Sequence, residues 1–381
     1  MQEFDTAIFG AGIAGASLAW RLVGKRSVAL IEQETQPGYH ATGRSAAMFM
    51  ESYGPPMVRA LTRASRSFYQ HPPLGFTDSP LLTPRGALFL ASPGQQMQLD
   101  ATRADLQATC PQLLQLDAAA TLARVPCLRP GKVLAALFDP DSMDLNVHAL
   151  HQGFLRGLRA LGAAQAAELF TGLELTSAAH NGRVWQLDFA DGSRLHARTI
   201  VNATGAWADQ FATLFKARPI GLVPKRRSAF TFKAPQGVDT SHWPAVIGID
   251  ESYYFKPDAG QLLGSPANAD PTHPHDVVPE ELDIATGIYQ IEAVSTLEIR
   301  RPGSTWAGLR SFVPDGEIVI GWDDQAPGFF WLAAQGGYGI QSAAGASALA
   351  DALIRDTALP DELRRQGVNA VAVSPKRLRA S

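Results

Sequence analysis

The chain has 381 residues, of which 46% are hydrophobic and 18% charged, and its formal net charge at pH 7 is −3. This composition can form a large core and argues against intrinsic disorder, and the length favours two domains over one. A near-neutral charge without a basic stripe interleaved with aromatic residues argues against a nucleic-acid partner.

The first predicted elements follow a strand, turn, helix, strand order. An apolar run at 5–10 stops at glycine, 13–24 has helical periodicity, and 27–32 is a second β-rich run. This order is typical of a βαβ unit. Further helices are expected at 55–70, in short pieces between 95 and 123, and at 146–161. In the last of these, Asn146 would be the N-cap, and the residues expected to point inward are Leu150, Phe154, Leu158 and Leu161.

The second half of the chain is predicted to be rich in strands. Asn-Gly and Asp-Gly turns separate the strands of a meander between 167 and 205, and a helix follows at 207–215. Strands between 219 and 264 suggest a large antiparallel sheet, completed by a helix at 279–296 and strands from 304 to 334. A glycine turn at 336–339 then opens a long helix of small residues.

These elements predict an α/β fold in which a Rossmann-like domain is interleaved with a β-rich substrate domain built from an antiparallel sheet and helices. The chain would leave the first domain and return to it twice. The predicted ranges are 1–80, 140–215 and 310–381 for the nucleotide-binding domain, and 81–139 and 216–309 for the substrate-binding domain.

The glycines of "GAGIAG" form the dinucleotide-binding fingerprint. Gly10 allows a tight turn, Gly12 lets the backbone approach a pyrophosphate, and Gly15 lets helix and strand pack closely. Glu32 follows about 20 residues later, where a carboxylate can accept hydrogen bonds from ribose hydroxyls, which argues against a 2′-phosphate. The fingerprint alone leaves NAD and FAD open. The segment "VNATGAW" (201–207) favours FAD, because flavoproteins with a split nucleotide domain often return to the dinucleotide with such a strand.

The segment "TGRSAA" (42–47) follows the second strand closely. Gly43 and the small residues Ser45, Ala46 and Ala47 would let the backbone come close to a flat ring. Arg44 could bind phosphate or be a surface charge.

Together with "GGYGIQSAAG" (336–345), these motifs resemble the D-amino-acid oxidase-like family of FAD enzymes. Within that family the chain looks most similar to the bacterial D-arginine dehydrogenase type, on segments such as "QPGYHATGRSAA", "PKRRSAF", "DESYYFKPDAGQLLGSPANADP" and "WAGLRSF". The resemblance covers essentially the whole chain and implies that FAD is the cofactor. It further implies that 42–47 packs along the isoalloxazine, with Ser45 at the flavin edge, and that a helix N-terminus after 336 faces the pyrimidine oxygen.

Some flavin oxidases of this fold bind the cofactor through a cysteine. No cysteine follows Cys127, so a bond from the C-terminal half is excluded and FAD is expected to be non-covalent. The cofactor-binding residues that the resemblance implies are Gly10, Gly12, Ile13, Ala14, Gly15, Glu32, Gln33, Thr42, Gly43, Arg44, Ser45, Ala46, Ala47, Ala203, Thr204, Gly205, Trp207, Gly336, Gly337, Tyr338, Gly339, Ile340 and Gln341.

The resemblance implies oxidative deamination of a D-amino acid to a 2-oxo acid and ammonia, by hydride transfer from Cα to flavin N5. Arg310 would clamp the substrate carboxylate. The other residues expected at the substrate are Tyr53, Tyr254, Arg227, Gly337 and Gln341, with the Gly337 carbonyl accepting from the amine. From the residues alone, the tyrosines could be half-buried strand or helix residues and the arginines surface charges. Arg226 is adjacent to Arg227, so a shift of the strand register by one residue would place Arg226 at the substrate in place of Arg227.

Two positions depart from the D-arginine dehydrogenase type. Met48 stands where that type has a histidine and Ala87 where it has a glutamate, and Met50 adds apolar character. An unpaired buried guanidinium is costly. We therefore predict a preference for apolar or uncharged D-amino acids over basic ones, which Glu51 or another acid could reverse.

Rival functions are a glycine- or sarcosine-type amine oxidase on the same fold and a non-catalytic nucleotide-binding protein. The expected partners are a small amino-acid substrate and an electron acceptor, which would be a quinone, the respiratory chain or oxygen. His40, His148 and His151 are expected to be structural or surface groups without a catalytic role.

The two cysteines, Cys110 and Cys127, are too few for a disulfide framework or a structural zinc site, and no metal centre is expected. No apolar run approaches the roughly 18 residues that a membrane span needs, and the first predicted strand leaves no room for a signal peptide. We therefore expect a cytoplasmic protein, with peripheral attachment to the inner membrane as the alternative.

Overall fold

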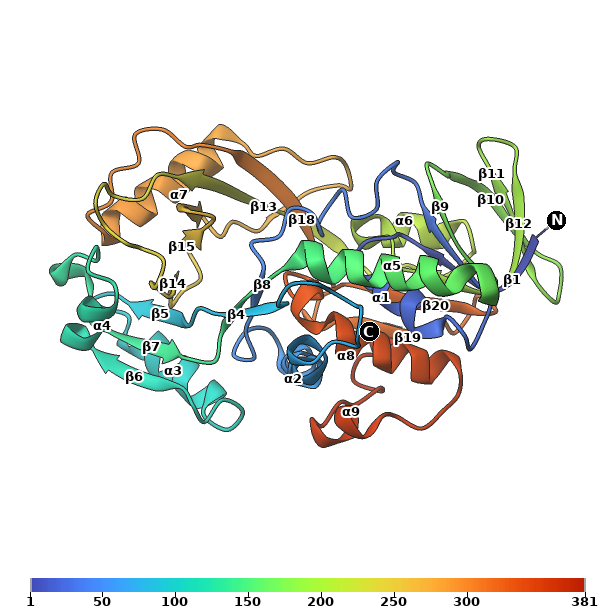
Figure 1. Cartoon of the computed structure of the whole chain (residues 1–381), viewed down its shortest axis with the longest axis horizontal. Coiled ribbons are helices and arrows are strands. Elements are labelled where there is room, and N and C mark those ends of the chain that lie inside the picture. The colour runs from blue at the N-terminus through green and yellow to red at the C-terminus, as the bar shows by residue number, and fades with distance from the viewer. Residues whose placement is uncertain (1, 380–381) are drawn as a thin grey trace.

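The computed structural model describes residues 2–379, except for the side chains of 161–165. The expected inward position of Leu161 therefore lies outside the described part. Two large sheets lie at opposite ends of an elongated molecule, and helices line the region between them and one face of the N-terminal sheet (Figure 1).

The first sheet has a parallel centre. Strands β9, β2, β1 and β12 follow one another in parallel, and β20 pairs in parallel with the last residues of β12. The first residues of β12 continue instead into an antiparallel meander with β11 and β10. The strands of this sheet are β1 (Gln2–Phe9), β2 (Val28–Glu32), β9 (Ala167–Thr171), β10 (Leu175–His180), β11 (Trp185–Phe189), β12 (Arg194–Asn202), β19 (Val319–Trp322) and β20 (Phe329–Ala333).

The predicted strand, helix, strand start is confirmed, and the predicted meander is confirmed for β10, β11 and β12. Its expected first part, β9, is wrong as a meander strand, because it pairs in parallel with β2 at the other edge of the sheet. The expectation that the strands between 304 and 334 complete the other sheet is wrong for β19 and β20, which pair with each other and join β12. Every residue of β20 is buried. A strand buried on both faces fits the centre of a parallel sheet covered by helices, not a half-exposed antiparallel sheet.

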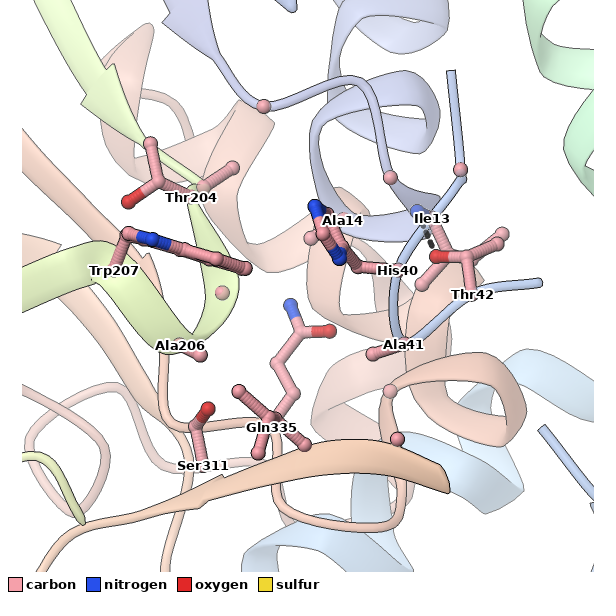
Figure 2. A pocket seen from close by; sticks show the side chains of 18 of the residues that line it. Ile13, Ala14, His40, Ala41, Thr42, Thr204, Ala206, Trp207, Ser311 and Gln335 are labelled. Atoms are coloured by element: carbon pink, nitrogen blue, oxygen red, sulfur yellow. Dashed lines mark hydrogen bonds between the residues drawn. The ribbon is translucent and has the colours of Figure 1, made fainter. Parts of the chain in front are cut away.

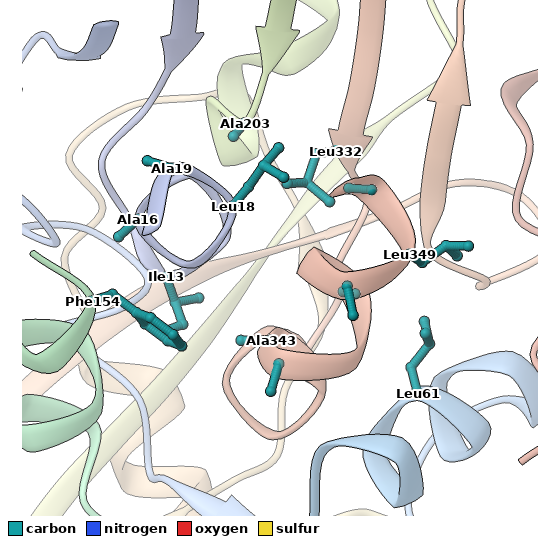
Figure 3. Close-up of a cluster of buried hydrophobic side chains, with 14 of the residues drawn as sticks. Ile13, Ala16, Leu18, Ala19, Leu61, Phe154, Ala203, Leu332, Ala343 and Leu349 are labelled. Atoms are coloured by element: carbon teal, nitrogen blue, oxygen red, sulfur yellow. The ribbon is translucent and has the colours of Figure 1, made fainter. Parts of the chain in front are cut away.

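Four helices cover one face of this sheet: α1 (Ile13–Leu22), α2 (Pro56–Gln70), α5 (Val147–Gln165) and α8 (Gly339–Ile354). Figure 3 shows the cluster between them, in which Ile13 of α1 lies near Phe154 of α5. The predicted cap of α5 is confirmed, because the Ala149 N–H donates to Asn146 Oδ1 at 2.9 Å. The opposite face of the sheet is covered by η2 (Gly205–Trp207) and α6 (Ala208–Thr213), which fill most of the predicted helix at 207–215.

The second sheet has nine strands. All neighbouring pairs are antiparallel except β14 and β5, so the predicted antiparallel sheet is confirmed apart from one pair. Its strands are β5 (Ala87–Ala91), β6 (Leu114–Asp117), β7 (Ala135–Asp139), β13 (Val223–Phe232), β14 (Ala245–Gly248), β15 (Tyr254–Asp258), β16 (Gln261–Ser265), β17 (Asp270–Pro271) and β18 (Thr305–Phe312).

The edge strand β6 lies in the segment where only short helices were expected. It separates α3 (Gln96–Leu106) from α4 (Ala118–Arg124) and has hardly any buried side chain, so the alternation that marks a half-buried strand is missing. The remaining helices are α7 (Glu281–Val294), α9 (Asp361–Arg365), η1 (Pro130–Lys132) and η3 (Pro375–Arg379).

A small third sheet connects the two large ones. It consists of β3 (Met48–Phe49), β4 (Leu82–Pro84) and β8 (Met143–Leu145). Asp144 of β8 accepts from Arg85 Nε and from Lys256 Nζ, each at 2.7 Å, and Lys256 belongs to the nine-stranded sheet. The proposed domain division places the boundary between 309 and 310, within β18, so this strand belongs to both predicted domains.

Across residues 2–379, none of the helices combines the length and the apolar character that crossing a bilayer requires.

Candidate functional site

A cavity of about 480 Å³ lies at the carboxyl ends of β1, β2, β12 and β20, and it extends to β13, β15 and β18 of the second sheet. Ligands of open α/β sheets bind outside the carboxyl ends of the strands, and the volume is within the usual range of about 300–1,000 Å³ for ligand pockets. Figure 2 shows His40, Ala41 and Thr42 on one side of the cavity and Thr204 and Trp207 on another.

The glycine turn after β1 accepts no side chain at two of its positions. Gly10 has φ of +95°, and a Cβ there would lie 2.4 Å from the Ala203 carbonyl oxygen. A Cβ at Gly15 would lie 1.9 Å from the Gly10 carbonyl oxygen. The fingerprint is therefore required by packing between the turn, α1 and the end of β12.

The peptide groups of Ala11 are held from both sides. Its N–H donates to Glu32 Oε2 and its carbonyl accepts from His151 Nε2, both at 2.8 Å. Burial lowers the pKa of His151, so the ring is neutral with its proton on Nε2. His151 is thus structural, as expected.

The start of α1 is also held by a neighbouring loop. The Ile13 N–H donates to Thr42 Oγ1 at 3.0 Å, which is the dashed line in Figure 2. Glu32 Oε1 accepts the Glu34 N–H at 3.0 Å. Each oxygen of the Glu32 carboxylate keeps a further lone pair for a hydroxyl donor in the cavity.

Most of the predicted cofactor-binding residues line this cavity. They are Gly10, Gly12, Ile13, Ala14, Glu32, Gln33, Thr42, Arg44, Ser45, Ala46, Ala203, Thr204, Gly205, Trp207, Gly336, Gly337, Gly339 and Ile340. The predicted residues outside the lining are Gly15, Gly43, Ala47, Tyr338 and Gln341.

Gln341 is turned away from the cavity. Its amide nitrogen donates to the Tyr53 carbonyl and to Thr62 Oγ1, both at 3.1 Å, and the side chain is buried between α8 and α2. Tyr338 packs edge-on against Tyr53, with ring centroids 5.0 Å apart. These two residues support the wall of the cavity instead of lining it.

Two guanidinium groups face the part of the cavity formed by the second sheet. Arg227 pairs with Gly308 and Arg310 with Lys225 across β13 and β18, so Arg227 and Arg310 are diagonal neighbours on one face of the sheet. Tyr254 of β15 lines the same region.

Neither guanidinium has an acidic partner. Arg310 Nη1 lies 3.4 Å from the Tyr53 hydroxyl, and Arg227 Nε donates to the Asn268 carbonyl at 2.6 Å. Within the described residues, no carboxylate pairs with either group, although Glu251 on the β14–β15 loop is close enough to act on Arg227. Burial, and then the charge of Arg310, lower the pKa of Arg227 to about 10. The arrangement is a half-buried pair of cations that lines the cavity.

Arg226 has the opposite environment. It pairs with Asp283 at 2.8 Å, with Glu280, and with Asp270 at 3.6 Å. Because successive side chains of a strand point to opposite faces, this ion cluster places Arg227 on the cavity side.

Gly337 lies directly against Arg310. A Cβ at this position would be 2.6 Å from Arg310 Nη1 and 2.8 Å from its Cζ. The absence of a side chain at 337 therefore makes room for the guanidinium.

The three positions predicted to form the side-chain pocket do not line the cavity. Met50 and Ala87 are buried in one apolar cluster with Phe89, and Met48 and Tyr53 pack at its edge. The direction of these side chains is fixed by the pairing of β3 with β8 and of β5 with β7, which sequence reasoning did not resolve. Tyr53, which packs against this cluster, is likewise outside the lining, although its hydroxyl reaches Arg310.

Glu51 is held by a partner of its own. Its Oε1 accepts from Arg66 Nε at 2.7 Å, so its charge is already paired.

Several lining residues were not predicted, among them Tyr39, His40, His275 and Val277. His40 contacts Glu34 at 2.8 Å and packs on the Trp207 ring at 4.6 Å between centroids. Tyr39 and His40 belong to the quoted segment "QPGYHATGRSAA", but nothing in that segment assigned them to the cavity, and His275 and Val277 come from a distant part of the chain. His148, by contrast, is exposed, as expected.

Arg44 also has a role that its motif did not indicate. Its guanidinium donates to the Tyr39, Val277 and Ala307 carbonyls and pairs with Asp276. It is neither a free phosphate ligand nor an isolated surface charge.

Among the residues that the structure describes, no three His, Cys, Asp or Glu side chains come together in a way that could hold a metal ion.

The sequence matches the family described as "FAD dependent oxidoreductase" over residues 5–352. A curated relative, the hydrogen cyanide synthase subunit HcnC of Pseudomonas aeruginosa, is 26% identical over 196 residues, which are 51% of this chain and 45% of that protein. The match thus spans less than half of the relative's length.

Two solved structures share the fold. Glycine oxidase from Geobacillus kaustophilus superposes with a TM-score of 0.80 at 20% identity and covers 94% of this chain and 96% of its own. L-proline dehydrogenase from P. horikoshii superposes with a TM-score of 0.80 at 19% identity, and the match covers 99% of this chain and 98% of that protein's chain.

The cavity fits the cofactor of this family. The glycine turn and the first residues of α1 let a pyrophosphate approach the backbone. Glu32, about 20 residues after the glycine turn, lines the cavity at the sequence interval expected for a residue that binds the ribose hydroxyls. The small side chains of Ser45 and Ala46 line the same cavity as Arg310. FAD is therefore the cofactor of this protein.

Proposed function

The chain belongs to the family of FAD-dependent oxidoreductases, and on this basis we propose that it oxidatively deaminates D-amino acids to 2-oxo acids and ammonia. The observation that supports this proposal is the pair of guanidiniums, Arg227 and Arg310, directed into the cofactor cavity without an acidic partner. A buried cation without a counter-charge is unfavourable in the free protein. It becomes favourable when the substrate supplies a carboxylate.

Arg310 holds the carboxylate by a bidentate pair, for which a planar guanidinium is suited. Arg227 adds a second positive charge on the same sheet face. The hydroxyl of Tyr254, which lines the cavity, and that of Tyr53, which contacts Arg310 from outside the lining, are the further partners for the carboxylate. The Gly337 carbonyl accepts from the substrate amine. Together these contacts fix the Cα–H bond toward the cofactor.

FAD, held by the glycine turn after β1 and by Glu32, would supply the two-electron acceptor for the hydride that leaves the substrate Cα. The chain contributes orientation and exclusion of water, which can supply a large part of the rate enhancement. The amine must be unprotonated, and the resulting imino acid is hydrolysed by water to the 2-oxo acid and ammonia. No catalytic acid or base is required of the protein.

We further propose that uncharged and apolar side chains are preferred over basic ones. The charge of Glu51 is already paired with Arg66, and Met48, Met50 and Ala87, which lie outside the cavity lining, add no acidic group that could pair with a basic side chain. Arg227 would also repel a cationic side chain. These contacts support, within the family, a substrate range different from that of the D-arginine dehydrogenase type.

A second candidate is a glycine- or sarcosine-type amine oxidase. The fold is shared with a glycine oxidase and with an L-proline dehydrogenase, and the carboxylate site would serve any of these substrates. A non-catalytic nucleotide-binding protein is disfavoured by the unpaired guanidiniums, since a protein that binds only the dinucleotide has no use for them.

The decisive experiment is an anaerobic reduction screen of the purified yellow protein. D-amino acids, their L-enantiomers, glycine and sarcosine are added in turn, and loss of flavin absorbance is followed. Reduction by uncharged D-amino acids is the expected result. Fastest reduction by D-arginine contradicts the side-chain preference, fastest reduction by sarcosine favours the amine oxidase, and no reduction by any compound contradicts an enzyme of this class.

The electron acceptor is proposed to be a quinone, the respiratory chain or oxygen, and the location to be cytoplasmic or peripheral to the inner membrane. The anaerobically reduced protein, mixed separately with oxygen and with a soluble quinone, identifies the faster acceptor.

A further inference from the structure

One wall of the cofactor cavity is built from three segments that are far apart in sequence. They are the loop 38–46, the turn 205–207, and the loop between β17 and α7 that contains His275 and Val277. The first two belong to the sheet that carries the glycine fingerprint, whereas the third belongs to the nine-stranded sheet. The contacts between these three segments therefore determine how firmly this wall of the cavity is held shut.

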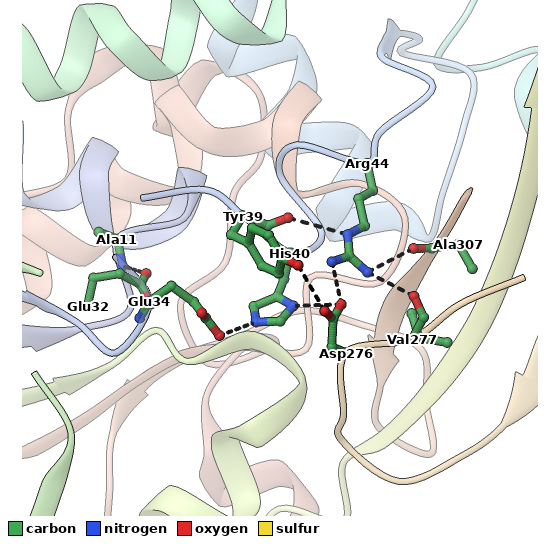
Figure 4. Close-up of polar contacts among 9 residues, drawn as sticks. All are labelled: Ala11, Glu32, Glu34, Tyr39, His40, Arg44, Asp276, Val277 and Ala307. Atoms are coloured by element: carbon green, nitrogen blue, oxygen red, sulfur yellow. Dashed lines mark hydrogen bonds and ion pairs between the residues drawn. The ribbon is translucent and has the colours of Figure 1, made fainter. Parts of the chain in front are cut away.

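Asp276 is the centre of the contacts that join these segments. Its carboxylate accepts from the Tyr39 hydroxyl at 2.9 Å and from Arg44 Nη2 at 2.5 Å, and it lies 4.0 Å from His40 Nδ1 (Figure 4). Tyr39, His40 and Arg44 all line the cavity, but Asp276 itself does not.

The contacts continue on both sides of Asp276. Arg44 Nη1 donates to the Val277 and Ala307 carbonyls, and the Trp306 indole N–H donates to the Arg44 carbonyl at 3.1 Å. His40 reaches Glu34 at 2.8 Å and packs against Trp207. The Asp276 carboxylate thus holds Tyr39 and Arg44, which line the cavity, although Asp276 itself does not line it.

We infer that Asp276 is a positioning residue for FAD retention: it fastens the β17–α7 loop across the loop 38–46 and so closes the wall past which the cofactor leaves. The carboxylate is the acceptor that Tyr39 and Arg44 share. An amide at this position removes the charge and leaves a single oxygen acceptor, so the wall opens more often. The inference concerns the cofactor alone and does not depend on the substrate.

The chain offers a matched control. Asp315 forms a comparable pair with Arg377 at 2.7 Å, on the surface near η3 and outside the cavity lining. The side-chain exposures are 55% for Asp276 and 16% for Arg44, against 43% for Asp315 and 15% for Arg377. The substitutions Asp276→Asn and Asp315→Asn therefore remove similar ion pairs and differ in whether the pair adjoins the cavity.

The test measures release of FAD from the holoenzyme. Each purified variant is diluted into flavin-free buffer and the rise of flavin fluorescence is followed, with a thermal melt of the same preparation. Asp276→Asn is expected to release FAD roughly ten-fold faster than the unsubstituted protein, a factor that corresponds to about 1.4 kcal/mol. Asp315→Asn is expected to lower the melting temperature comparably but to keep the original release rate.

Two further variants guard against a folding defect. Tyr39→Phe removes one donor to Asp276 but keeps the ring, which lies 5.0 Å from the Arg44 guanidinium, and it should speed release by a smaller factor. Asp276→Glu keeps the charge and should release FAD more slowly than Asp276→Asn. Equal release rates for Asp276→Asn and Asp315→Asn would overturn the inference, as would unchanged release from Tyr39→Phe if Asp276→Asn does not fold. Deamination activity is not the readout, so a failure here is distinguishable from a wrong substrate.

Discussion

Replacing Gly337 by alanine is expected to weaken substrate binding through displacement of Arg310. The new Cβ would lie 2.6 Å from Arg310 Nη1, whereas ordinary contact begins at 3.4 Å, so the guanidinium must retreat by about 0.8 Å. Its side chain is flexible and can do so without unfolding α8. A displacement of about 1 Å at a reacting centre can cost about 100-fold in rate.

The magnitude also follows from the hydrogen bonds at risk. A hydrogen bond to a charged group contributes about 1.5–3 kcal/mol, which corresponds to about 10- to 150-fold in an equilibrium constant. We therefore expect Gly337→Ala to lower kcat/KM for the best substrate by about 10- to 100-fold, mostly through KM, while the protein still binds FAD.

The assay is a double-mutant cycle in steady-state kinetics. Gly337→Ala is measured alone and in an Arg310→Met background, where the displaced group is absent. If the alanine acts through the guanidinium, it has little further effect in that background. An equal loss in both backgrounds, or an unchanged KM in the single variant, refutes the reasoning.

Three further predictions concern neighbouring features. Arg227→Met should raise KM at least about ten-fold without lowering the free energy of unfolding, whereas Arg226→Met, which leaves the buried carboxylate of Asp283 without its cation, should lower it by about 1–3 kcal/mol in denaturant titrations. Gly345→Ala places a Cβ 2.4 Å from a backbone carbonyl of α2, and it should destabilise the protein by about 1–3 kcal/mol in a thermal melt without changing kcat/KM. The depressed pKa of His151 means that the unfolded chain takes up this proton first as the pH falls below about 6.5, so stability is lost there. His151→Gln should flatten this part of the pH dependence of the melting temperature below about pH 6.5, and His148→Gln, at an exposed position of the same helix, is the matched control.

The features that could be predicted from sequence are those fixed by short-range geometry. The turn at Gly10 and the packing at Gly15 depend on atoms of the same βαβ unit and of the strand end at Ala203, so the glycine spacing carries the information. The cap at Asn146 is local in the same way. Arg310 was found because its segment resembles a family motif, not because its spacing indicates a carboxylate.

The features that could not be predicted depend on which distant segments meet. Asp276 is separated from its partner Arg44 by 232 residues, and no sequence pattern around either residue predicts contact with the other. The direction of the Met50 and Ala87 side chains depends on strand pairing, and both are buried in an apolar cluster outside the cavity lining. Sequence reasoning identified the residue types near the site but not the faces they present.

The charges of the cavity also explain why two arginines remain unpaired in a protein that pairs most of its others. Arg226, one residue away, is surrounded by acidic side chains, so the nine-stranded sheet could have neutralised Arg227 in the same way. It instead leaves Arg227 and Arg310 adjacent, at an electrostatic cost that burial increases. A ligand carboxylate between them removes this repulsion and gains two charge-assisted contacts. On the proposed function, an anionic substrate would therefore relieve the unfavourable surroundings of Arg227 on binding, and a neutral amine without a carboxylate would not. Amines lacking the carboxylate should therefore fail to reduce the flavin at concentrations at which the corresponding amino acids reduce it fully.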